Sequence, residues 1–126
     1  MSEFEFIEAA HLAMDWLVNA SMNSVAVTFA YIIASYFAGS GLSKFSAIGL
    51  SLLYSLFLIG PMSGILVASG RYIQTTGQYH IEYPDGWALQ EIPSLSTMLV
   101  MGLLPVALGW LASIAFLHLY IRKAET

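Results

Sequence analysis

Three long apolar stretches constrain this chain more than any other feature of its sequence. They run roughly over residues 12–38, 45–69 and 95–121. Each is longer than the about 20 helical residues that cross the hydrocarbon core of a bilayer. Only 10% of the residues are charged, too few to cover the surface of a water-soluble domain. The sequence therefore predicts an all-α integral membrane protein, with about three transmembrane helices in one domain over residues 1–126.

The connections between the apolar stretches differ in character. The turn after the first stretch contains Gly39 and Gly41, and two glycines permit a sharp reversal of the chain. The first two helices are therefore predicted to be antiparallel neighbours. The polar segment 70–94 is predicted to be a short extracytoplasmic loop.

Part of that loop has the alternation of a strand. Tyr79, Ile81 and Tyr83 alternate with polar residues, which is the period of a half-exposed strand. A turn signal, Pro84-Asp85-Gly86, follows. We therefore expect a small hairpin lying on the membrane surface.

The basic residues predict an orientation. Lys44 follows the first turn, and Arg122 and Lys123 follow the third stretch, which puts three basic residues on one side of a three-span protein. Arg71 is alone on the other side. Because cytoplasmic segments of membrane proteins are enriched in Lys and Arg, the C-terminus is predicted to be cytoplasmic and the N-terminus extracytoplasmic.

A polar stripe runs along the first predicted helix. It begins in an acidic amphipathic N-terminal extension and enters the apolar stretch with spacings of three and four, which form a single helix face. Its residues are Glu8, His11, Asp15, Asn19 and Asn23. Two geometries are open: a separate helix lying on the membrane, or a helix that continues into the first span. Two roles are also open: Asn residues that hydrogen-bond neighbouring helices, or the lining of a water-filled path.

Small residues recur in the other two stretches at spacings that favour close helix packing. Proline residues in both stretches predict kinks. The residues concerned are Ser51, Ser55, Gly60, Pro61 and Gly64 in the second stretch, and Gly102, Pro105 and Gly109 in the third.

Other residues are given interfacial positions. Tyr31, Tyr36, Phe37 and Phe45 are interpreted as an aromatic belt around the first turn. His118 is interpreted as an interfacial anchor or hydrogen-bond partner near the end of the third stretch.

The sequence argues against several classes of function. It contains no cysteine, which excludes thiolate metal sites and cysteine nucleophiles. The spacing of Glu8 and His11 matches half of a helical di-metal site, but no second motif accompanies it, so no metal site or cofactor is expected. No basic cluster suggests binding to nucleic acid. No catalytic motif is present, and we expect no enzymatic activity.

Three functions remain for such a chain. The favoured one is a non-catalytic, multi-pass membrane subunit that associates with other transmembrane helices in a homo- or hetero-oligomeric complex. Its expected partners are the lipid bilayer and those helices. One alternative is a homo-oligomeric pore or ion channel, lined by the polar face of the first helix. The other is a small metal or redox enzyme subunit.

Overall fold

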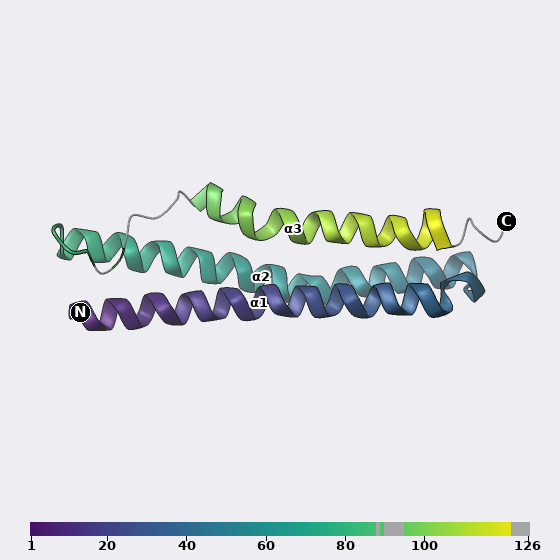
Figure 1. Ribbon diagram of the computed structural model, residues 1–126, viewed down its shortest axis with the longest axis horizontal. Coiled ribbons are helices and arrows are strands. Elements are labelled where there is room, and N and C mark those ends of the chain that lie inside the picture. The colour runs from purple at the N-terminus through teal and green to yellow at the C-terminus, as the bar shows by residue number, and fades with distance from the viewer. Residues whose placement is uncertain (88, 90–94, 122–126) are drawn as a thin grey trace.

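The structure, a computed structural model, describes residues 1–87, 89 and 95–121. This part of the chain folds into three long helices that lie lengthwise beside one another (Figure 1): α1 (Glu3–Ala38), α2 (Lys44–Glu82) and α3 (Leu95–Ala115). A 3-10 turn, η1 (Gly39–Gly41), joins the first two, and a π-helical segment, η2 (Phe116–Ile121), continues α3. All three are long and apolar enough to cross a membrane. The predicted all-α fold with three such helices is confirmed; Arg122 and Lys123 lie outside the described residues.

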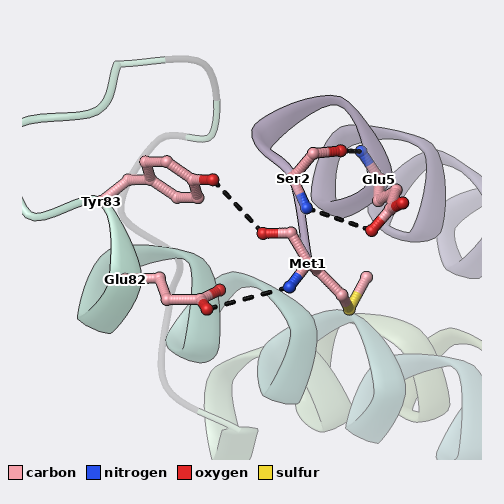
Figure 2. A network of polar contacts seen from close by, with 5 residues as sticks. All are labelled: Met1, Ser2, Glu5, Glu82 and Tyr83. Atoms are coloured by element: carbon pink, nitrogen blue, oxygen red, sulfur yellow. Dashed lines mark hydrogen bonds and ion pairs between the residues drawn. The ribbon is translucent and has the colours of Figure 1, made fainter.

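Helix α1 is continuous over 36 residues. It begins with a capping box, in which the Ser2 hydroxyl accepts from the Glu5 backbone N–H (3.2 Å) and the Glu5 carboxylate accepts from the Ser2 N–H (3.1 Å). Figure 2 shows this reciprocal pair at the start of the helix. The acidic extension and the first apolar stretch are therefore one helix, and the alternative of a separate helix is wrong.

Helix α2 runs for 39 residues, through Pro61 and past Gly70, to Glu82. The expected strand around Tyr79–Tyr83 is therefore wrong for the residues up to Glu82, and the first part of the predicted loop is helical. Thr76 and Tyr79 are fully buried and share one helix face, so packing against α1 overrides the local alternation. The turn signal is confirmed, because the Gly86 N–H donates to the Tyr83 carbonyl at 2.9 Å.

The first two helices form the predicted antiparallel pair. Along α1, from its C-terminal half towards its start, Tyr31, Trp16 and Phe6 contact residues progressively later in α2. Their ring contacts are with Tyr54, Arg71 and Tyr79 respectively. The two helices therefore stay in register along nearly their whole length.

Helix α3 covers only part of this pair. A Cβ built on Gly102 of α3 would lie 3.0 Å from Ile65 Cγ2 of α2. Ser96, in the first turn of α3, lies six residues before Gly102. Arg71 of α2 lies six residues after Ile65 and is therefore at a similar level, because the two helices run in opposite directions. The start of α1 and the end of α2 thus project beyond α3 (Figure 1). We call residues 3–15 of α1 and 71–82 of α2 the two-helix extension.

Aromatic contacts hold the two-helix extension together. Phe6 meets Tyr79 and Tyr83 edge to face, with ring centroids 6.0 and 6.1 Å apart. The Tyr79 hydroxyl donates to the Glu3 carboxylate at 2.8 Å. At the tip, the Tyr83 hydroxyl donates to the Met1 carbonyl (3.2 Å) and the terminal amine lies 3.8 Å from Glu82 Oε1 (Figure 2). The extension is therefore a packed helix pair with its own small core.

The contact between α1 and α2 at Gly64 can be tested by substitution. A Cβ on Gly64 would lie 3.0 Å from the Ala20 Cβ, whereas a Cβ on Gly60 would meet nothing within 4 Å. Gly64→Leu should therefore force the helices apart and destabilise the fold by about 1–3 kcal/mol. Gly60→Leu, one helical turn away, should leave stability nearly unchanged. Denaturant titration of both variants in detergent measures the difference; equal losses would contradict the packing described here.

Candidate functional site

The polar stripe on α1 faces away from the rest of the chain. All five of its residues are exposed: Glu8, His11, Asp15, Asn19 and Asn23. The buried face of α1, which contains Phe6, Ala10 and Ala20, lies on the other side of the helix. Within the described part of the chain, neither Asn side chain has a hydrogen-bond partner. The neighbouring helices that were predicted to hydrogen-bond these Asn residues are therefore not α2 or α3.

The stripe crosses two environments. Glu8 and His11 lie in the two-helix extension, and Asp15 lies at its base. Asn23 lies seven residues past Trp16, which is about 10 Å along a helix, at a level where α3 runs alongside. Towards the other end, the exposed residues of the same face are apolar: Ala26, Ala30, Ile33 and Phe37.

The predicted packing residues of α2 and α3 fall into two groups. Gly64 and Gly102 make the close helix contacts described above, whereas a Cβ on Gly60 or Gly109 would meet nothing within 4 Å. Gly102, Pro105 and Gly109 line an open groove of about 430 Å³ between α1 and α3. Pro61 and Pro105 both lie inside continuous helices.

Ser51 joins all three helices through hydrogen bonds, which the small-residue interpretation missed. Its Oγ lies 2.9 Å from the Tyr31 hydroxyl of α1 and 2.8 Å from His118 Nε2 of η2. It also donates to the Ala47 carbonyl at 3.0 Å. Ser51 is only 8% exposed, so this cluster lies inside the bundle.

The Ser51 hydroxyl has a single proton, which limits how the hydrogen bonds of this cluster can be arranged. Ser51 and His118 are as close as a nucleophile and its general base. A hydroxyl carries one proton, however, and a backbone carbonyl can only accept. When that proton goes to the Ala47 carbonyl, Tyr31 and His118 must both donate to Ser51. With the proton placed in this way, the cluster links the three helices and His118 donates to the Ser51 oxygen.

A second set of bonds extends this cluster. The Ser55 hydroxyl donates to the Ser51 carbonyl and accepts from the Trp110 indole N–H of α3, both at 2.8 Å. The Tyr54 hydroxyl lies 2.8 Å from Thr28 Oγ1 of α1. Thr28, Tyr54 and Trp110 were not singled out from the sequence, whereas Ser51 and Ser55 were singled out as packing residues and not as hydrogen-bonding ones.

The position of Tyr31 differs from the one predicted. It is 4% exposed and stacks on Tyr54, with ring centroids 4.2 Å apart, so it belongs to the core and not to the aromatic belt. Tyr36, Phe37 and Phe45 are exposed, as a belt requires. His118 is a hydrogen-bond partner within the π-helical segment η2. Leu117, its neighbour in the sequence, is fully buried and lies close to Gly39.

The described residues contain no group of three or more His, Asp or Glu side chains that could hold a metal ion. Glu8 and His11 lie on the exposed face of one helix. Comparisons of the chain with protein-family models, curated proteins and solved structures found no match. The functional assignment therefore depends on the geometry of the chain itself.

The Ser51 cluster predicts a stability effect. Ser51→Ala leaves the Tyr31 hydroxyl and the His118 imidazole without this partner inside the bundle, which should cost about 1–3 kcal/mol. Ser63→Ala, an exposed serine on the same helix, is the matched control and should change little. The free energy of unfolding in detergent is measured for both variants. A Ser51→Ala variant as stable as Ser63→Ala would contradict the view that the hydrogen bonds of Ser51 hold the three helices together.

Proposed function

We propose that this chain is a non-catalytic subunit of a membrane complex and that it crosses the bilayer three times. The spacing of its aromatic residues supports this placement. From Trp16 to Tyr36 is twenty residues of α1, or about 30 Å, which matches the hydrocarbon thickness of a bilayer. Trp16 lies at the base of the two-helix extension. Tyr36, Phe37 and Phe45 are exposed at the opposite end, and aromatic side chains favour both interfaces of a bilayer.

The observation that carries the proposal is the exposure of Asn19 and Asn23. In this placement both amides lie at the depth of lipid chains. A polar side chain at that depth is costly unless it meets protein or water, and in the described structure neither side chain has a partner within the chain. The function that best accounts for them is contact with a helix of another chain, either a second copy or a different subunit.

The residues that follow them on the same face are suited to such a contact. Ala26 and Ala30 continue the exposed face at helical spacing. Small side chains let two helix backbones approach closely, and amides can then hydrogen-bond between the helices. We call Asn19, Asn23, Ala26 and Ala30 the outer face of α1 and propose that it is the association surface.

A pore lined by this stripe is the alternative. The stripe is continuous from the two-helix extension to Asn23, which favours entry of water and of cations attracted by Glu8 and Asp15. Beyond Asn23 the same face becomes apolar, with Ile33 and Phe37. A conduction path needs polar groups or water along its whole length, so the geometry favours association over conduction.

Cysteine cross-linking tests the association surface, because the chain contains no cysteine of its own. Asn23→Cys and Ala26→Cys in native membranes should form disulfide-linked dimers if the partner is a second copy. With a bifunctional thiol-to-amine reagent, they should form adducts with another polypeptide if the partner is a different subunit. Ile59→Cys is the control, since Ile59 is exposed on α2 at a similar depth. Equal yields from Ile59 and the α1 positions would rule out a specific outer face.

We also propose that the N-terminus is extracytoplasmic, on the distribution of basic residues. Gln78→Cys, at the exposed end of α2, should then react with a membrane-impermeant maleimide on intact cells. Ser40→Cys, in the exposed turn after α1, should react only after permeabilisation. The reverse pattern would invert the proposed orientation, and labelling of both positions on intact cells would contradict three spans.

A further inference from the structure

Arg71 has an unusual setting at the base of the two-helix extension. Its guanidinium carbon lies 4.7 Å from the ring centroid of Trp16, within the range of a cation–π contact. The indole therefore holds the guanidinium across the α1–α2 interface. Of the two Lys and Arg residues that the structure describes, Lys44 begins α2 and Arg71 lies at the base of the two-helix extension.

No carboxylate of the described residues forms an ion pair with Arg71. Among the residues described, the ion pair that is formed joins the Met1 amine to Glu82. A guanidinium has five N–H donors in its plane, and a ring contact on its face leaves those donors available. With respect to the described part of the chain, Arg71 thus presents an oriented cation whose N–H donors are available.

A hollow of about 160 Å³ lies beside this guanidinium. Gln74 and Thr75 line it on the α2 side and supply an amide and a hydroxyl. Leu12 and Ala13 line it on the α1 side and are apolar. One wall can therefore hydrogen-bond an anion while the other accepts hydrocarbon.

A second, acidic hollow adjoins the first. It is lined by Glu5, Glu8, His11 and Asp15, and it shares Ala9 and Leu12 with the hollow at Arg71. A cationic site and an anionic site thus lie on either side of these two apolar residues. A ligand that carries a phosphate beside an ammonium group has the complementary charges.

We propose that Arg71, with Gln74 and Thr75, binds the phosphate of a zwitterionic phospholipid whose ammonium group faces Glu8 and Asp15. The inference rests on the proposed membrane placement, in which Trp16 and Arg71 lie at the boundary where lipid phosphates are found. Arginine binds phosphate through two parallel hydrogen bonds, and basic pockets between transmembrane helices bind lipid headgroups. The acidic hollow selects phosphatidylethanolamine over phosphatidylglycerol, whose headgroup has no ammonium group.

Lipid titration of the purified full chain, followed by native mass spectrometry, tests the proposal. Arg71→Gln should weaken phosphatidylethanolamine binding by at least about tenfold, because two charge-assisted hydrogen bonds are lost. Lys44→Gln, which removes the exposed cation at the opposite end of α2, is the matched control and should leave binding unchanged. Equal affinities for Arg71→Gln and Lys44→Gln would overturn the site.

Two further measurements examine the ligand. Glu8→Gln combined with Asp15→Asn should abolish the preference for phosphatidylethanolamine over phosphatidylglycerol; a preserved preference would overturn the role of the acidic hollow. Inorganic phosphate should not displace the lipid, and displacement at similar affinity would make this a site for free phosphate. Trp16→Leu is a second variant, and its lipid affinity should also fall.

Failure of the lipid site can be distinguished from failure of the proposed function. Resistance to alkaline extraction reports membrane insertion independently of lipid affinity, and circular dichroism reports helix content. An Arg71→Gln variant that is inserted and helical but binds lipid normally overturns only the lipid site. A wild-type chain that alkali extracts from membranes overturns the proposed function as well.

Discussion

The hydroxyl of Ser51 joins all three helices of this protein, and their arrangement depends on it. In an apolar bundle no water is present to satisfy a polar group, so a buried hydroxyl that finds a partner in the protein avoids a large cost. Tyr31, Ser51 and His118 meet this requirement together. Because hydrogen bonds depend on direction, they fix the rotation and the register of the helices, which apolar contacts alone specify poorly.

The same requirement distinguishes two faces of α1. Ser24 and Thr28 lie on the inner side and have hydrogen-bond partners, the Ser21 carbonyl and the Tyr54 hydroxyl. Asn19 and Asn23 lie on the outer side and have none in the described structure. In the proposed function, a helix of another chain supplies the hydrogen bonds that these two surface amides lack.

Much of the fold could be predicted from the sequence, because length and hydropathy identify helices that can cross a membrane. The long α2 could not, since its last turns are polar and their helical state depends on Phe6, which is distant in the sequence. The hydrogen-bond cluster around Ser51 was not predicted, for a related reason. Small-residue spacing predicts close approach, but the distance from Ser51 to His118 follows only from the assembled bundle. The exposed stripe on α1 could be predicted because its residues share one continuous helix.

The uninterrupted course of α1 has a mechanical consequence. A helix with no break between Glu3 and Ala38 transmits displacement as a stiff rod, and its tip is tied to the end of α2 by Tyr79 and Tyr83. In the proposed membrane placement, whatever touches this tip outside the bilayer tilts the segment that carries Asn19 and Asn23, because α1 has no break between them. In that placement, a contact made in water at the tip can alter the proposed contact between helices in lipid.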